Sequence, residues 1–210
     1  MRTRIRPLGI VLIICALLIG CANGGIELSA EPEIEEMTPP AAEDLVSWHR
    51  VDRLDLPFYA DDGWAEEVST ADLGWKTIEY PISDSQYYTV SVYEQETEEE
   101  DLDAAAESVA EELELTDSGM MYKNTQIQTK GWTNGNVDGK LVSYLTKYED
   151  GFYSGYKEGY RDIIQDDTSY GKILVILDDH KLYQFRMTAY RDEDAAFRAF
   201  DRLTSSIGMS

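Results

Sequence analysis

The spacing of apolar side chains predicts most of the secondary structure beyond about residue 48. Residues 87–93 alternate between larger apolar and small polar side chains, which is typical of a strand with one buried face. Residues 172–177 form a strand-like run that is continuously apolar after Lys172 and rich in β-branched side chains, which favours the centre of a sheet. We expect strands over 87–93, 122–132, 140–148, 172–177 and 182–190, with Tyr183, Phe185, Met187 and Ala189 on one face of the last.

Two segments repeat apolar side chains at helical spacing. The first stripe contains Leu102, Ala105, Ala106, Val109 and Leu113, and the second contains Ala196, Phe197, Phe200, Leu203 and Ile207. Thr97 and Glu100 form the pattern of a capping box before the first helix, and Asp192 is placed to cap the second. Gly208 stands where the second helix should stop.

Turn signals separate the expected strands. Asn134-Gly135 and Asp138-Gly139 lie between 122–132 and 140–148, and Asp178–Lys181 joins the last two strands. The order is therefore strands, a helix, an antiparallel meander and a second helix. This order predicts an α+β fold, with helices packed on a single antiparallel sheet.

Charge narrows the range of partners. The chain carries 41 acidic and 18 basic side chains, a net charge of −23. Because phosphate recognition needs clustered Lys and Arg, we expect no nucleic acid partner. Nine acids and no base lie within 98–114, so the outer face of the first helix should be solvated.

The N-terminus has the pattern of a secretory signal peptide. Arg2, Arg4 and Arg6 precede an apolar run of 12 residues, 8–19, which is short for a membrane span. The exit Leu18-Ile19-Gly20-Cys21 resembles the prokaryotic lipobox. That resemblance implies removal of residues 1–20, a diacylglyceryl thioether on Cys21 and a lipid-anchored protein on the extracytoplasmic side of the cell membrane. The alternative is an uncleaved anchor helix with an incidental cysteine.

Cleavage would change the chemistry of the mature chain. The removed segment holds three Arg and no acid, so the net charge of −23 would become −26. Cys15 would leave with it and Cys21 would carry lipid, so disulfides and thiolate chemistry are excluded from the domain. Residues 22–46 hold seven acids, three prolines and no base. We expect residues 21–46, here called the tether, to be disordered, and residues 47–210 to form a single domain.

The order of elements resembles the PsbP-like, Mog-type α/β/α sandwich. The features that carry this resemblance are Gly74-Trp75, the acidic helix near Leu102–Leu113, the Asn134-Gly135 turn and the closing segment from Leu182 to Ile207. It covers roughly residues 55–208, although the stretch 149–170 is longer than that family leads us to expect. The resemblance implies an accessory or binding role without catalysis, and it transfers no catalytic residue.

Residues suited to catalysis or metal binding are few. The chain has two histidines, His49 and His180, and His180 falls in an expected turn beside two acids. Adjacent acids could bind calcium or serve a glycoside hydrolase, but a chain with 41 acids contains such pairs by composition alone. We therefore predict no catalytic residue, no metal site and no cofactor.

The segment 152–160 is rich in tyrosine and glycine. Tyrosine rings on a flexible backbone suit adaptable binding surfaces, where they stack on sugars or dock peptides. This interpretation assigns ligand binding to Tyr153, Tyr156 and Tyr160, with Trp132 either on the same surface or in the core. The alternative is a long hairpin whose tyrosines cover the sheet.

These features favour a membrane-anchored, non-catalytic binding or accessory protein. Its membrane contact is the N-terminal lipid, and its partner is another envelope protein or a saccharide. Two other functions stay open, namely a cell-surface, carboxylate-dependent hydrolase and an acid-rich structural protein adapted to high salt.

Overall fold

A computed structural model describes residues 33–70, 75–81, 87–115, 122–148, 168–191 and 193–209. All of them belong to one compact unit, Pro32–Ser210. Its elements, in chain order, are β1 (Ile34–Glu36), the 3-10 helix η1 (Ala42–Leu45), β2 (Trp48–Val51), β3 (Phe58–Asp61), β4 (Glu67–Thr70), β5 (Lys76–Tyr80), β6 (Tyr88–Glu96), α1 (Leu102–Leu115), β7 (Tyr122–Thr133), β8 (Asp138–Tyr148), β9 (Thr168–Asp178), β10 (Lys181–Ala189) and α3 (Glu193–Ser205).

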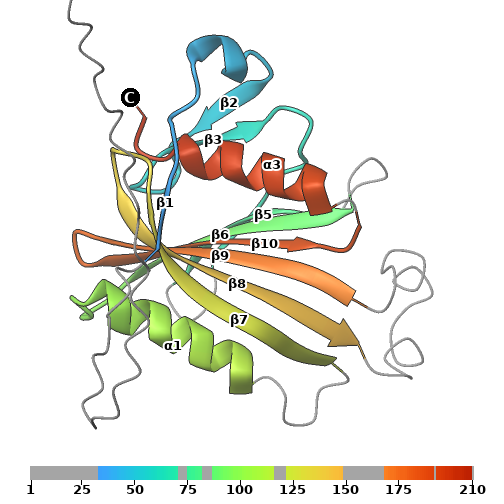
Figure 1. The fold of residues 1–210 in the computed structure, drawn as a ribbon. Coiled ribbons are helices and arrows are strands. Elements are labelled where there is room, and N and C mark those ends of the chain that lie inside the picture. Colours follow the sequence, from blue (N-terminus) through green and yellow to red (C-terminus); the bar gives the residue numbers. More distant parts are fainter. Residues whose placement is uncertain are drawn as a thin grey trace, which may run out of the picture. The chain divides into compact units, whose positions relative to one another are not determined.

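The unit is built around an eight-stranded sheet in the order β1-β7-β8-β9-β10-β6-β5-β4. Helix α1 packs on β7, β8 and β9, whereas α3 packs on β10 and on β3. The two helices cover opposite faces of the sheet, and the β2–β3 pair lies on the same side as α3 (Figure 1). We call these the α1 face and the α3 face of the sheet.

The prediction of a single antiparallel sheet needs correction. The α+β class agrees with the structure, but the large sheet is mixed because β1 pairs with β7 in parallel, with Ile34 opposite Gly131. Strands β2 and β3 form a second, two-stranded sheet. Strand β1 escaped prediction because it lies in an acidic, proline-containing stretch with no alternation of apolar residues.

The predicted boundary at residue 46 also differs from the structure. Residues 33–46 contribute β1 and η1, so disorder is wrong for this half of the tether. Backbone hydrogen bonds to β7 hold β1 at both of its ends. Gly131 N–H donates to the Glu33 carbonyl at 2.9 Å, and Met37 N–H donates to the Thr133 carbonyl at 2.7 Å. Lys130 forms an ion pair with Glu35. The rest of the tether and the signal segment lie outside the described residues.

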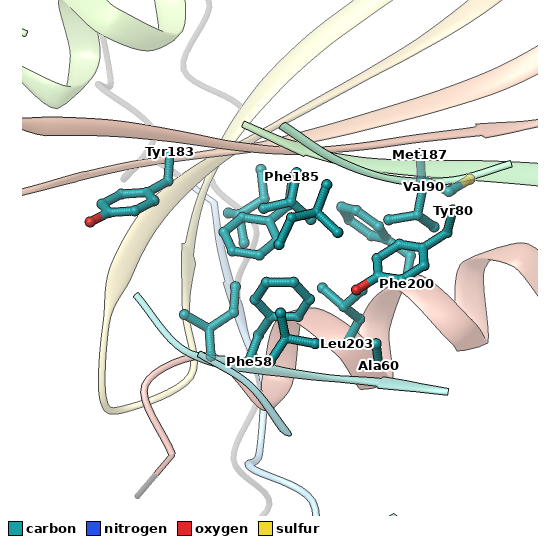
Figure 2. Close-up of a cluster of buried hydrophobic side chains, with 14 of the residues drawn as sticks. Phe58, Ala60, Tyr80, Val90, Tyr183, Phe185, Met187, Phe200 and Leu203 are labelled. Atoms are coloured by element: carbon teal, nitrogen blue, oxygen red, sulfur yellow. The ribbon is translucent and has the colours of Figure 1, made fainter. Parts of the chain in front are cut away.

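Alternation along the central strands divides the core into two clusters. On β9, Ile173 and Val175 join α1 in the smaller cluster, whereas Leu174 and Ile176 face α3. The larger cluster also contains the predicted β10 stripe of Tyr183, Phe185, Met187 and Ala189. In Figure 2, side chains from β3, the sheet and α3 fill this layer, with Phe58 edge-on to Phe185 at 5.4 Å between ring centroids.

Both predicted helical stripes are confirmed, but α1 begins differently from the prediction. The capping acceptor is Asp101, whose Oδ1 accepts hydrogen bonds from the backbone N–H of Asp103 at 2.8 Å and of Ala104 at 3.4 Å. Thr97 accepts instead from Glu99 N–H, in the turn before the helix. The sequence contains several short polar residues before Leu102, and the pattern alone did not select the right one.

The turn between β7 and β8 is tied to the end of α3. Asn134 is buried, and its side-chain amide donates to the Ile207 carbonyl at 2.9 Å and to the Ser205 carbonyl at 3.2 Å. Gly135 and Gly208 both have positive φ, as their predicted turn and stop positions require. Asp138-Gly139, predicted as a turn, lies instead within β8. The predicted cap, Asp192, lies outside the described residues.

Candidate functional site

The structure places Trp132 in the core, which is the second of the two placements that the sequence left open. Its side chain is 3% exposed and belongs to the larger core cluster. It pairs across the strands with Gly139 on β8. A Cβ at Gly139 would lie 2.9 Å from Leu174, so only glycine leaves the space that this row of the sheet needs. Tyr153, Tyr156, Tyr160 and Cys21 lie outside the described residues.

The α3 face of the sheet, on which Trp132 lies, also carries a groove over β7, β8 and β9. Register pairs Gln128 on β7 with Ser143 on β8, and Ser143 with Lys172 on β9. In the next row, Leu145 is paired with Tyr170. On β10, Met187 is paired with Lys172 and Ala189 is paired with Tyr170, and both of these β10 residues are buried in the core. In these two rows the α3 face of the sheet is therefore core at β10 and a more polar, open surface at β7, β8 and β9.

The groove has a volume of about 270 Å³. It is lined by Gln126, Gln128, Ser143, Tyr144, Leu145, Tyr170, Gly171, Lys172 and Phe197. Among the described residues of this lining, Lys172 is the one that carries a charge, and none is a carboxylate. That composition is unusual for a chain with 41 acidic side chains.

One wall of the groove is aromatic and rigidly held. Tyr170 is 39% exposed and meets Phe197 edge-on, with ring centroids 6.5 Å apart. Lys172 Nζ lies 4.5 Å from the centroid of the Phe197 ring and 3.1 Å from Asp201 Oδ1 on α3. The Lys172 charge is thus already neutralised by Asp201, and its ammonium fixes the Phe197 ring through a cation–π contact.

The opposite wall offers uncommitted hydrogen-bonding groups. Gln126 and Gln128 are exposed, and Ser143 is half-buried. Within the described ranges, none of these three side chains forms a hydrogen bond with another residue. Gln126 has a φ of 55° and marks the irregularity in the β7–β8 register between Thr125 and Gln128. Both amide side chains line the groove at this irregularity of β7.

A second polar region surrounds Glu94 on β6. Glu94 is 3% exposed, and no other carboxylate among the described residues is buried. Its oxygens accept from Lys76 Nζ at 2.6 Å, Lys181 Nζ at 3.4 Å and the backbone N–H of Asp55 at 2.7 Å. Lys181 also forms an ion pair with Asp55. Every partner comes from a different element, so this cluster ties β5, β6, β10 and the β2–β3 loop together.

The pKa values of this cluster follow from its contacts. Burial alone would raise the pKa of Glu94, but hydrogen bonds from Lys76 and Asp55 N–H, together with the two lysine charges, outweigh burial and lower it. The hydrogen bond from Lys181 lowers the pKa of Asp55 and raises that of Lys181. Burial, and then the charge of Glu94, raise the pKa of Tyr183 to about 12.

A cleft of about 520 Å³ adjoins this cluster at the β9–β10 turn. It is lined by Glu96, Thr97, Glu98, Asp179, His180 and Lys181. Asp179 and His180 both have positive φ, as a two-residue hairpin turn requires, and the His180 carbonyl accepts from Thr97 N–H at 2.9 Å. His180 is exposed and His49 contacts Asp62 at 3.0 Å on the surface, so neither histidine lies in a dry pocket.

Two further features are absent from the described part of the chain. No group of three or more His, Cys, Asp or Glu side chains there is arranged to hold a metal ion. No helix in that part combines the length and apolar character that a membrane crossing demands.

Neither a known protein family nor a curated protein matches the chain in sequence. In fold, the chain is similar to the solution structure of cyanobacterial PsbP (CyanoP) from Synechocystis sp. PCC 6803, with a TM-score of 0.55 and 14% identity. The match covers 78% of this chain and 93% of that chain. The domain has a PsbP-like fold. At this identity the likeness concerns the fold alone, so a role for the PsbP-like domain must come from its own residues.

Proposed function

We propose that this protein is a lipoprotein whose PsbP-like domain is held at the extracytoplasmic surface of the cell membrane and binds a partner or ligand without catalysis. Residues 1–20 act as the signal peptide and Cys21 carries the lipid. The observation that carries the proposal is the order of segments: a cationic start, 12 apolar residues and Gly20-Cys21 are followed by an acidic stretch and then by a domain that contains no cysteine.

The start of β1 sets how far the domain can stand from the membrane. Ile34 follows Cys21 by 13 residues, which extend to at most roughly 45 Å. Two acyl chains anchor a protein stably, whereas one chain binds only weakly. The domain would therefore stay close to the lipid headgroups, where it can meet other envelope components.

The contacts of Glu94 support binding over hydrolysis. A carboxyl group that works as a general acid needs a raised pKa, as burial away from cations produces. Glu94 is buried but surrounded by two lysines, and its pKa is lowered, as is that of Asp55. Glu94 is buried within these contacts, and Asp55, although exposed, is paired with Lys181, so neither carboxyl group has the raised pKa of a general acid.

Mass spectrometry of protein purified from the membranes of its own cells tests the anchor. We expect an N-terminal peptide that begins at Cys21 and carries the mass of a diacylglyceryl group, with or without a further acyl chain. The Cys21→Ser variant should keep residues 1–20 or appear in the soluble fraction. Wild-type protein with an unmodified Cys21 thiol would overturn the proposal.

Cross-linking in intact cells tests the binding role. Wild-type protein should give reproducible conjugates, and replacement of Tyr153, Tyr156 and Tyr160 by alanine should reduce them without unfolding the domain. Tyr87→Ala is a suitable control because Tyr87 is an exposed tyrosine elsewhere on the domain. A wild-type protein that forms no conjugate above background would count against a binding function.

A further inference from the structure

The groove on the α3 face differs in charge from the rest of this acidic chain. The described residues of its lining include no carboxylate, and the one cation among them, Lys172, is already paired with Asp201. A cationic ligand would find no partner there, and an anionic ligand would meet a neutralised lysine on a chain with a net charge of −23. The electrostatics therefore favour an uncharged ligand.

The chemistry of the two walls defines that ligand further. The amides of Gln126 and Gln128 and the hydroxyl of Ser143 each both donate and accept hydrogen bonds, as sugar hydroxyls do. Tyr170 and Phe197 present aromatic surface across from them, against which the apolar C–H side of a sugar ring can pack. Polar groups on one side and a ring on the other suit a pyranose better than a purely apolar molecule.

We propose that this groove binds a neutral saccharide, with Tyr170 as the stacking residue and Gln128 and Ser143 as hydrogen-bonding residues. The inference deepens the proposed binding function and rests on it. A volume of about 270 Å³ falls just under the range of sites for drug-sized ligands, so the groove holds one sugar ring and leaves the neighbouring rings in solvent.

The strand pairing argues against a peptide as the occupant. An extended peptide gains most of its affinity by adding to a free sheet edge. Strands β8 and β9 are paired on both sides, so their backbone groups are already used along the groove. A peptide added to the part of the β7 edge that β1 does not cover would lie beside the groove, and one lying over the groove would have to rely on side-chain contacts alone, whereas a saccharide needs no backbone partner.

Saturation-transfer NMR and calorimetry on the full mature chain test the proposal. The protein should be held in phosphocholine micelles, because maltoside detergents would themselves offer sugar rings. The probes are cellobiose, maltose and N,N′-diacetylchitobiose with their tetramers, and digalacturonate as an anionic counterpart. We expect saturable binding of at least one neutral probe and weaker binding of digalacturonate.

Variants then locate the site. Tyr170→Ala should weaken binding about tenfold, and Gln128→Ala or Ser143→Ala about threefold each. Tyr87→Ala is the matched control, because Tyr87 is 38% exposed against 39% for Tyr170, and it should leave affinity unchanged.

The failures of the two proposals can be told apart. No saturable binding of any neutral probe, or binding that survives Tyr170→Ala, would overturn the saccharide site, and so would equal affinity for a tetra-alanine peptide. The lipid on Cys21 and the conjugates in intact cells would still stand in those cases. Loss of those two results would instead overturn the proposed function.

Discussion

The two polar regions of this domain differ in how their hydrogen-bonding groups are used. Around Glu94, each carboxylate oxygen has a partner, and the partners come from β5, β10 and the β2–β3 loop. Along the groove, Gln126, Gln128 and Ser143 make no such bond with a described residue. The first region is more deeply buried, yet the second keeps the capacity to bind something else.

This difference separates polar residues that stabilise the fold from polar residues that remain available. A buried charge must be paired, because leaving it unpaired costs several kcal/mol. An exposed amide costs the fold almost nothing, so the fold does not explain why two glutamines and a serine face one aromatic wall. Variants of each region should therefore affect different measurements.

The largest effect is expected at Glu94. Glu94→Gln should lower the free energy of unfolding by about 2–3 kcal/mol at pH 7, because two lysines lose their shared carboxylate and Asp55 N–H keeps only a neutral acceptor. Chemical denaturation of the full chain measures this loss. A change below about 0.5 kcal/mol would mean that the Glu94 cluster contributes little to stability and does not differ from the groove residues in this respect.

The same variant has a signature in pH. The folded-state pKa of Glu94 lies below the ordinary value of 4.5, so its contribution is complete above that value and is lost as the pH falls through the folded pKa. The difference between wild type and Glu94→Gln should therefore shrink below about pH 4. Gln95→Ala, on the same strand, serves as the control.

Gly171 should give the next largest effect, because the sheet is tightly packed there on its α1 face, opposite the groove. The Tyr144 ring crosses Gly171, and a Cβ there would lie 2.0 Å from its nearest atom. Gly171→Ala should cost about 2 kcal/mol of stability, measured by thermal and chemical unfolding. Adding Tyr144→Ala should cost less than the sum of the two single variants, since the clash is then gone. Additive losses would contradict this explanation.

The smallest effect on stability is expected at the polar wall of the groove. Gln128→Ala and Ser143→Ala should each change the free energy of unfolding by less than about 0.5 kcal/mol, because neither side chain bonds within the described fold. Differential scanning calorimetry of the two variants beside wild type tests this. A loss above about 1 kcal/mol would place these residues with the Glu94 cluster.

Periodicity predicted the elements that depend on their own sequence. The strands at 87–93 and 172–177 and both helices could be predicted from local patterns, namely alternation, a continuous apolar run and helical spacing. They appear as β6, β9, α1 and α3. Strand β1 was missed because it is held by the edge of β7 and by Lys130, not by an apolar pattern of its own. Its parallel pairing made the sheet mixed.

The groove could not be predicted because it depends on register between strands far apart in the chain. Gln128, Ser143 and Lys172 meet only when β7, β8 and β9 are aligned, and a shift of one residue would send each side chain to the other face. Trp132 illustrates the same difficulty, since its burial depends on Gly139 across the strand. The one local sign of the groove in the sequence is the pair Gln126 and Gln128, two polar residues within the expected strand 122–132.

The lipid anchor proposed at Cys21 would give the short parallel ladder of β1 a mechanical role. A pull from the bilayer would then reach the domain first through three residue pairs at the sheet margin, Ile34–Gly131, Glu35–Trp132 and Glu36–Thr133. Detaching them would free the backbone as far as η1 and add roughly 25 Å of slack. The segment between the lipid and the domain would therefore lengthen before force reached the other seven strands of the sheet.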